Sequence, residues 1–235
     1  SICDSIFSAF YFIDEDGMIM TCANAVTLRN NKFSLLINRK NSGLLSLSPF
    51  NKQLALLIEN NRFSNISVRG ESHRELTDST GVVVTVKPHK AESLSEVEET
   101  EETHIAFSMV FKDCQVENIE NGYVVKLTKT FCNECLIRNT SFSASRKEIL
   151  LGMGIVDISE GSMGELRVED ITLPLWSPEP FPFFRILNSE FVLKLEEVEY
   201  ISPTAEYFFL ALMNSGSLLI KDSVFYNFTV QVESV

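Results

Sequence analysis

Three asparagine triplets have the pattern that accepts an N-linked glycan. They are Asn65-Ile66-Ser67, Asn139-Thr140-Ser141 and Asn227-Phe228-Thr229, and each places a hydroxyl two residues after a side-chain amide. Glycans at Asn65, Asn139 and Asn227 would indicate a secreted or surface protein. The same three asparagines also fall at one position of an internal repeat, so a structural role is the alternative that we favour.

Five cysteines could support redox or metal chemistry. Cys114 and Cys135 occupy the same position in adjacent repeats, and we expect them to lie side by side in the fold. Cys132 and Cys135 form one Cys-x-x-Cys pair without the second pair that many zinc sites have. Buried free thiols are the favoured interpretation, a Cys114–Cys135 disulfide and a metal site are the alternatives, and we expect no metal.

Two polar segments, 69–80 and 87–104, contain all three histidines and are predicted to be inserted loops. The second is rich in glutamate, which is typical of a solvated loop. Hydrolysis of a glycosidic bond needs two carboxylates at a set distance. The only concentrated candidates for such chemistry are Arg69, Glu71, His73, Arg74 and Asp78. A plain surface loop is the better interpretation, so we expect no catalytic residue and no cofactor.

A proline-rich segment, 173–184, holds the single tryptophan. Prolines fix an extended loop that interrupts strands. Exposed aromatic rings on such a loop could contact a carbohydrate or a protein. Trp176, Phe181 and Phe183 are therefore the candidate binding loop, with packing of Trp176 onto the fold as the alternative.

The overall composition limits the classes of partner. The net charge of −12 disfavours nucleic acid, whose phosphates the chain would repel, and it disfavours anionic lipid. No run of about 18 apolar residues occurs, so we expect no direct membrane contact. The apolar fraction of 45% is sufficient for a sizeable core. We expect one domain over residues 1–235, cut from a longer solenoid because neither end resembles a polar capping repeat.

A repeat of about 20 to 30 residues organises these elements. In each unit two apolar residues at alternating positions precede an anchor residue, and a further apolar run follows. Such short alternating runs, rich in β-branched and aromatic residues, predict strands. The anchors are Phe7, Phe33, Phe63, Val116, Ile137, Val168, Val198 and Phe225. The pattern predicts an all-β fold, a right-handed parallel β-helix of about eight coils with three short strands per coil, one coil carrying both inserted loops.

Asparagine or aspartate recurs two residues after the anchor. A turn between strands favours these residues because they tolerate left-handed backbone angles, and stacked side chains can hydrogen-bond along the column. The predicted ladder consists of Asn65, Asn118, Asn139, Asp170 and Asn227.

The unit Ser-Gly-Ser-Leu-Leu-Ile-Lys-Asp-Ser-Val-Phe-Tyr-Asn-Phe-Thr, residues 215–229, resembles the repeats of the pectin-lyase-like superfamily, in particular the arrays of large surface and adhesin-like proteins. The resemblance implies an extracellular or surface module that acts without catalysis. Such a module would be an elongated scaffold that binds a protein or carbohydrate partner, or a part of a larger assembly stacked end to end. A polysaccharide lyase or glycoside hydrolase of the same superfamily is the alternative.

Overall fold

The computed structural model describes most of the chain. The described residues are 1–8, 11–12, 19–38, 43–49, 52–68, 81–88, 104–120, 122–143, 153–173, 183–201, 208–213, 217–226 and 229–233. Within these ranges the regular structure is entirely strand, and no helix occurs that could span a membrane. The strands pair in parallel and form two sheets.

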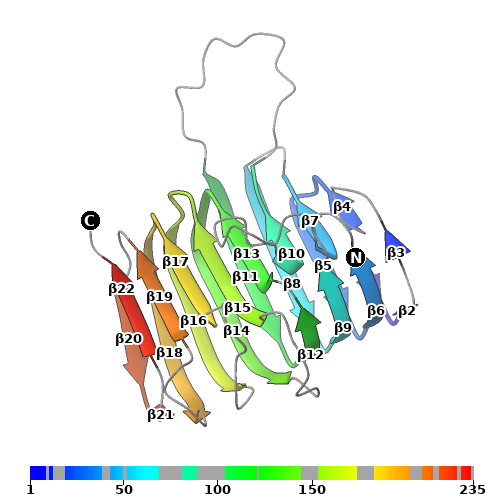
Figure 1. The fold of residues 1–235 in the computed structure, drawn as a ribbon. Helices are drawn as coiled ribbons and strands as arrows, with labels where there is room; N and C mark the ends of the chain where they lie inside the picture. Colours follow the sequence, from blue (N-terminus) through cyan, green and yellow to red (C-terminus); the bar gives the residue numbers. More distant parts are fainter. Residues whose placement is uncertain are drawn as a thin grey trace, which may run out of the picture.

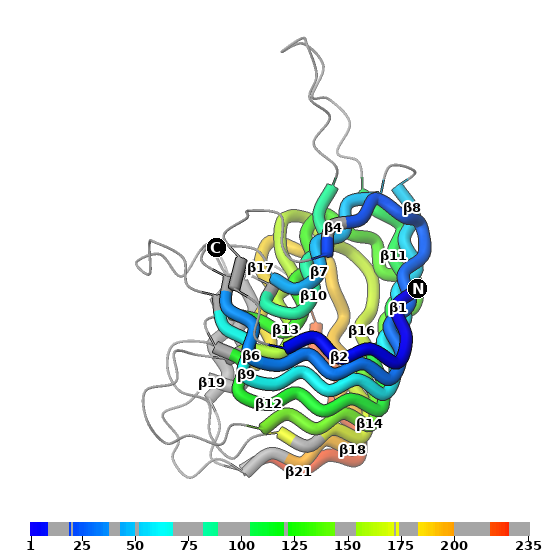
Figure 2. Tube along the Cα trace, turned by 90° about the vertical axis from the view of Figure 1, so that its right-hand side faces the viewer, coloured from blue at the N-terminus to red at the C-terminus, as the bar shows by residue number. Residues whose placement is uncertain are grey.

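The larger sheet has 14 strands and takes three strands from the first pass of the chain and two strands, or one long strand, from each later pass. Figure 2 shows β2, β6, β9 and β12 running side by side in that order. The strands are β1 (Ile2–Cys3), β2 (Ile6–Ser8), β3 (Tyr11–Phe12), β5 (Ala25–Arg29), β6 (Lys32–Asn38), β8 (Gln53–Glu59), β9 (Arg62–Val68), β11 (Ile105–Lys112), β12 (Gln115–Glu120), β14 (Thr130–Ser143), β16 (Met163–Thr172), β18 (Glu190–Ile201), β20 (Ser217–Lys221) and β21 (Val224–Tyr226).

The smaller sheet has 8 strands and receives one strand from each pass, before the chain returns to the larger sheet. The strands are β4 (Ile19–Thr21), β7 (Leu45–Leu47), β10 (Gly81–Val86), β13 (Gly122–Thr128), β15 (Met153–Ser159), β17 (Phe184–Leu187), β19 (Phe208–Met213) and β22 (Thr229–Glu233). Colours in Figure 1 run from blue to red along the stack, so neighbours in space are successive passes of the chain. This all-β, all-parallel arrangement is compatible with a β-helix-like solenoid.

Two columns of apolar side chains fill the space between the sheets, and their members in one pass are five residues apart. The first column aligns Ile2, Leu28, Ile58, Phe111, Ile137, Val168, Leu195 and Ile220. The second aligns Phe7, Phe33, Phe63, Val116 and Phe142, and pairs Tyr200 with Phe225. Leu28, Phe33, Ile58 and Phe63 have no exposed surface.

Phenylalanine rings stack along the second column. The ring centroids of Phe7 and Phe33 are 4.8 Å apart, and those of Phe33 and Phe63 are 5.2 Å apart, with nearly parallel planes. The spacing follows the distance between neighbouring strands. Each ring therefore packs on the ring before it, and burial of such apolar surface contributes about 25 cal/mol per Å².

The predicted anchors are correct for the first four repeats and wrong for three of the later ones. Ile137 and Val168 lie in the first column, because they pair with Phe111 and Leu195, respectively. Val198 lies in neither column and pairs with Ile171. The partner of Val116 is Phe142, five residues after Ile137. The two columns are both inward-facing and apolar, so a sequence template cannot tell a residue of the first column from one of the second.

The inserted loops lie mostly beyond what the structure describes. Segment 69–80 is outside the described residues, and so is 89–103 of the second loop. Of the remaining loop residues, His104 lies within 2.7 Å of the carbonyl oxygen of Gly161 through its Nε2 atom.

Candidate functional site

A bend with left-handed backbone angles separates the first and second strand segments of every pass through the larger sheet. The residues at this bend have φ between 45° and 56°, and Asn and Asp are the residues other than glycine that best tolerate such values. We call these residues the bend ladder: Asp4, Asn30, Asn60, Asp113, Asn139, Asp170, Glu197 and Asp222.

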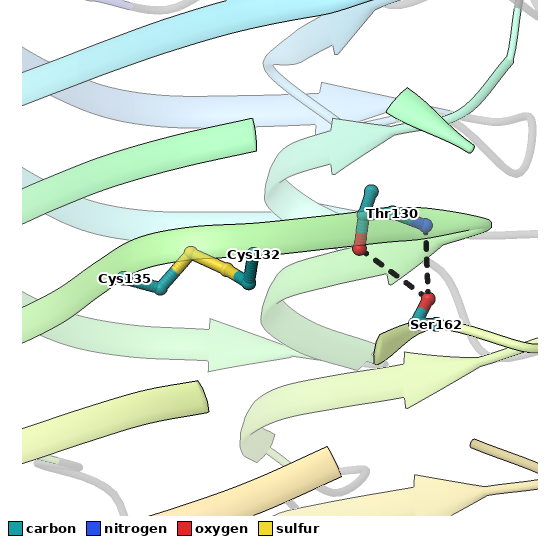
Figure 3. Close-up of a disulfide and its surroundings, with 4 residues drawn as sticks. All are labelled: Thr130, Cys132, Cys135 and Ser162. Carbon is teal, nitrogen blue, oxygen red and sulfur yellow. Dashed lines mark hydrogen bonds between the residues drawn. A yellow bond between two sulfur atoms is a disulfide. The ribbon is translucent and has the colours of Figure 1, made fainter. Parts of the chain in front are cut away.

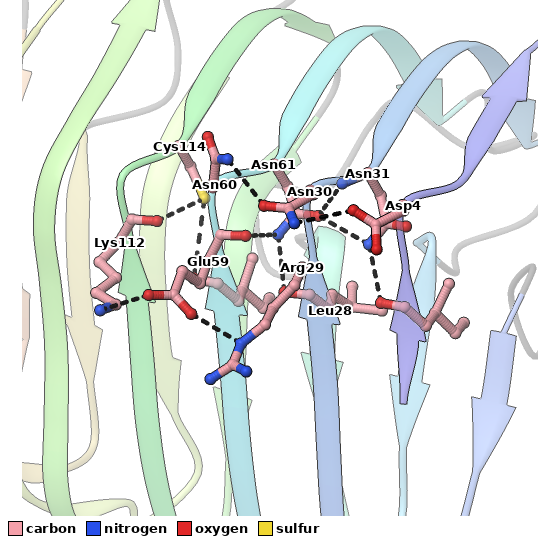
Figure 4. Close-up of polar contacts among 12 residues, drawn as sticks. Asp4, Leu28, Arg29, Asn30, Asn31, Glu59, Asn60, Asn61, Lys112 and Cys114 are labelled. Atoms are coloured by element: carbon pink, nitrogen blue, oxygen red, sulfur yellow. Dashed lines mark hydrogen bonds and ion pairs between the residues drawn. The ribbon is translucent and has the colours of Figure 1, made fainter.

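Side-chain amides link members of the bend ladder along the stack. Asn30 Nδ2 donates to Asp4 Oδ1 at 2.9 Å, and Asn60 Nδ2 donates to Asn30 Oδ1 at 2.8 Å (Figure 4). Asn139 Nδ2 donates to Asp113 Oδ1 at 2.7 Å. In each case the later residue donates to the earlier one. An aspartate can therefore accept a hydrogen bond from the next pass, but it has no amide with which to donate one to the previous pass.

The predicted single asparagine ladder is therefore divided between two bends. Asn65 and Asn118 lie at a second bend, and Asn118 Nδ2 donates to Asn65 Oδ1 at 3.0 Å. Asn139 and Asp170 lie in the bend ladder instead, because their anchors were misassigned by five residues. Asn227 lies outside the described residues.

Two buried asparagines form a third set of contacts beside the bend ladder. Asn61 Oδ1 accepts from the backbone N–H of Asn31 at 2.9 Å and from Asn31 Nδ2 at 3.0 Å (Figure 4). Asn61 Nδ2 donates to the carbonyl oxygens of Leu28 and Glu59. These side chains hold the bend from inside. The Asn-Asn doublets at 30–31 and 60–61 were the sequence signal for them.

Cys114 follows the bend-ladder residue Asp113 and is a buried free thiol, as its sequence position predicted. Its Sγ donates to the carbonyl oxygen of Lys112 at 3.1 Å. Burial raises the pKa of this thiol to about 11, and hydrogen bonds from Asn61 only partly oppose that effect. Cys114 is consequently neutral at physiological pH and is a poor nucleophile.

A polar hollow of about 270 Å³ lies over the bend ladder, lined by the turn between β11 and β12 and by residues of β12, β14 and β16. Its lining offers carboxylate, amide and hydroxyl groups, all of which can bond to a ligand rich in hydroxyls. Gln115 and Ser141 are exposed, as are Asp113 and Asp170. We call this set the bend hollow: Asp113, Cys114, Gln115, Asn139, Thr140, Ser141 and Asp170.

Cys132 and Cys135 form a disulfide within β14 (Figure 3), with their Cα atoms 5.9 Å apart. The favoured prediction of free thiols is wrong for this pair, and the alternative Cys114–Cys135 bond is not the one formed. Two cysteines three residues apart on a regular strand would face opposite sides. A register shift between Cys132 and Cys135 inserts one residue, and as a result both side chains are buried.

The second polar cluster is a buried ion pair on the smaller sheet. Arg185 Nε lies 2.8 Å from Asp157 Oδ1, and Arg185 Nη2 lies 2.9 Å from Asp157 Oδ2. Burial opposes the charge of Arg185, but the hydrogen bonds and charge of Asp157 outweigh it and raise the pKa of the guanidinium. The guanidinium carbon also lies 5.1 Å from the centre of the Tyr123 ring, and burial raises the pKa of that phenol.

No motif of the sequence marks Asp157, Lys126 or Arg185. Asp157 pairs in register with Lys126 on one side and Arg185 on the other, so neither cation stands alone. Asp157 has no exposed surface, and its bidentate contact already occupies both carboxylate oxygens. This arrangement serves the fold and leaves the carboxylate poorly placed to exchange a proton with a substrate.

The candidate aromatic loop is corrected at one position. Phe183 has no exposed surface and belongs to the core, so it is not a binding residue. Trp176 and Phe181 lie outside the described residues. The candidate acid–base residues Arg69, Glu71, His73, Arg74 and Asp78 also lie outside them.

Metal binding has no support in the described ranges, where no group of three or more His, Cys, Asp or Glu side chains is arranged to hold an ion. In comparisons with protein-family models, curated proteins and solved structures, nothing matched this chain.

Proposed function

We propose that the chain is a right-handed parallel β-helix of eight coils, with three short strands per coil, that acts as an elongated extracellular or surface scaffold without catalytic activity. The bend ladder supports this proposal, since it recurs once in each pass. The sequence separations of its hydrogen-bonded neighbours are 26, 30 and 26 residues. A scaffold of this kind presents a long surface, whose individual patches take the partner.

The bend hollow is the patch that carries the binding part of the proposal. Its carboxylate, amide and hydroxyl groups match the hydroxyls of a carbohydrate, and its volume of about 270 Å³, just below the usual range of small-molecule pockets, suits a small ligand such as a single sugar. None of the described residues that line it is basic, so a sugar with a free carboxylate or sulfate is disfavoured. The proposed partner is a glycan without acidic groups, presented on a polysaccharide or on a glycoprotein.

Charged residues on the rest of the outer face of the larger sheet mostly neutralise one another. Glu59 contacts both Lys112 and Arg29, at 2.6 Å and 2.8 Å (Figure 4). Arg167 contacts Glu169, and Lys194 contacts Glu165. Pairs that are satisfied internally contribute little to an electrostatic partner site, which leaves the bend hollow as the stronger candidate.

A polysaccharide lyase or glycoside hydrolase of the pectin-lyase-like type is the second proposal. Tyr123, Asp157 and Arg185 favour it, because they gather an acid, a cation and a phenol in one place. Their burial and mutual pairing weigh against it, since a catalytic group has to reach the substrate.

Binding is tested with a glycan array, followed by calorimetry on the sugars that bind. Ser141→Trp fills the bend hollow, whereas Ser143→Trp places the same ring on an exposed position of the same strand beyond it. We expect Ser141→Trp to lower affinity by at least about tenfold, which corresponds to about 1.4 kcal/mol, and Ser143→Trp to leave it unchanged. Equal effects of the two variants would exclude the hollow.

Turnover separates the two proposals. The same sugars are incubated with the protein and examined for new reducing ends or unsaturated products. Products that disappear in Arg185→Met under conditions where circular dichroism shows this variant to be folded, but persist in Ser141→Trp, would replace the scaffold proposal by the enzyme. Binding without products supports the scaffold.

A further inference from the structure

We infer that Asn65 carries an N-linked glycan in the folded protein and that Asn139, with the same acceptor triplet, does not. The inference rests on the proposed extracellular role, because the glycan is added in the secretory pathway. The inference depends on the hydrogen bonds that Nδ2 of Asn65 and Nδ2 of Asn139 make in the fold. The sequences of the two triplets do not show these bonds.

Asn139 is held through the nitrogen that a glycan would use. Its Nδ2 atom donates to the carboxylate of Asp113 at 2.7 Å. Asp113 and Asp170 stand on the two sides of Asn139 in the bend ladder, and both line the bend hollow with it. A sugar on this nitrogen replaces one of its hydrogens and places a ring among these side chains. The ring therefore crowds a hydrogen bond to a charged group, which is stronger than one between neutral groups.

Asn65 is held through its other side-chain atom. Its Oδ1 accepts from Asn118 Nδ2 at 3.0 Å, and its Nδ2 donates no hydrogen bond among the described residues. Leu35 precedes Asn65 at the same bend, with φ of 54° at both positions, and its side chain offers no acceptor. Asn65 is also exposed. A glycan on Nδ2 leaves the amide oxygen intact, so the sugar and the contact with Asn118 coexist.

Transfer precedes folding of this strand. Ile66 and Ser67, the rest of the acceptor triplet, are 3% and 6% exposed in the folded chain, and a transferase needs to reach the hydroxyl as well as the amide. The donor is a lipid-linked oligosaccharide diphosphate. The bond from the sugar anomeric carbon to the phosphate oxygen breaks, the bond from that carbon to Asn65 Nδ2 forms, one Nδ2 proton is lost, and the lipid diphosphate leaves.

The test is site occupancy after secretion of the whole chain from eukaryotic cells behind a cleavable signal. Glycans are removed enzymatically in heavy-oxygen water, and peptides from the medium and from the soluble intracellular pool are quantified by mass spectrometry. We expect occupancy at Asn65 to exceed that at Asn139 by roughly tenfold in the secreted pool, which consists of folded chains, the factor that about 1.4 kcal/mol corresponds to; the intracellular pool should show a smaller difference, because it includes chains that have not folded. Equal or higher occupancy at Asn139, or none at Asn65, would overturn the inference.

Two variants keep both asparagines and remove one acceptor at a time. Ser67→Ala is expected to abolish nearly all glycan on the described part of the chain, whereas Ser141→Ala is expected to change it little. The reverse result would place the glycan on Asn139. Sugar-binding assays on enzymatically deglycosylated protein test the proposed function separately, so failure of one does not determine the other.

Discussion

The outward-facing side chains of the two sheets differ in how far they are exposed to solvent. In β11 of the larger sheet, buried and partly exposed residues alternate along the strand. In β7 of the smaller sheet, consecutive residues are all buried, and β13 and β17 are nearly the same. An outward-facing strand position is therefore in contact with water in the larger sheet and is covered by protein in the smaller sheet.

The ion pairs show the consequence of this difference. Glu59 contacts two partly exposed cations in the larger sheet, Arg29 and Lys112. Asp157 is fully buried in the smaller sheet and has the buried partner Arg185. Exposed pairs contribute little to stability, whereas removing one member of a buried pair leaves a desolvated charge. The loss of one charged partner should therefore change the stability of the fold little in the larger sheet and strongly in the smaller sheet.

Breaking the buried pair is expected to have the largest effect. Arg185→Met leaves Asp157 charged and without its bidentate partner, and we expect a loss of about 3 to 5 kcal/mol in the free energy of unfolding. Urea unfolding followed by circular dichroism measures it. The double variant Asp157→Asn/Arg185→Met removes both charges and should be the more stable of the two. A single variant as stable as the wild type would show that the smaller sheet does not isolate this pair.

The bend ladder gives the next largest effect and belongs to the larger sheet alone. Asn60→Ala removes the bond to Asn30 and places alanine, which tolerates left-handed angles less well than asparagine, at φ of 54°. The lost bond contributes about 1 kcal/mol and the left-handed backbone about 1 to 2 kcal/mol. We therefore expect the free energy of unfolding, measured with urea, to fall by about 2 to 3 kcal/mol. Asn60→Gly relieves the backbone cost and isolates the side-chain bond. Equal losses in the two variants would contradict a backbone contribution.

Reduction of the Cys132–Cys135 disulfide is expected to have a smaller effect. The bond closes a short loop, for which restriction of the unfolded chain gives about 2 kcal/mol. The measurement compares unfolding of the protein with and without a phosphine reductant. The double variant Cys132→Ala/Cys135→Ala is the control and should show no dependence on reductant. A reductant effect that persists in this variant would place the redox sensitivity elsewhere in the chain.

Much of the architecture could be predicted from the sequence because strand period and core composition agree. Alternating apolar residues, frequent aromatics and a recurring Asn or Asp were sufficient to indicate parallel strands with stacked bends. Phe7, Phe33, Phe63 and Val116 are aligned as predicted. The signal was strong there because a polar doublet precedes Phe33 and Phe63 and marks the bend.

The register of the later repeats could not be predicted, for a physical reason. Each pass buries two apolar residues five positions apart, such as Ile137 and Phe142, and either can serve as the anchor. In β14 an inserted residue between Cys132 and Cys135 also breaks the alternation that would have fixed the phase. The disulfide depended on that same insertion. The bend hollow depended on Asp113, Asn139 and Asp170 being neighbours, which required the correct register.

The smallest expected effect lies on the exposed face of the larger sheet. A hydrogen bond from Lys112 lowers the pKa of Glu59 below its usual 4.5; burial opposes this, and the charges of Lys112 and Arg29 reinforce it. A lowered carboxyl pKa stabilises the fold at pH values above the usual pKa, and this contribution is lost as pH falls through the folded pKa.

Lys112→Gln should raise the pKa of Glu59 toward 4.5, while Arg29 keeps it partly lowered. Carboxyl titration by NMR measures the shift, and Lys52→Gln, at an exposed lysine with no bearing on Glu59, is the control. An unchanged pKa in Lys112→Gln would mean that the exposed pair is broken in solution, which would widen the contrast with Asp157 and Arg185.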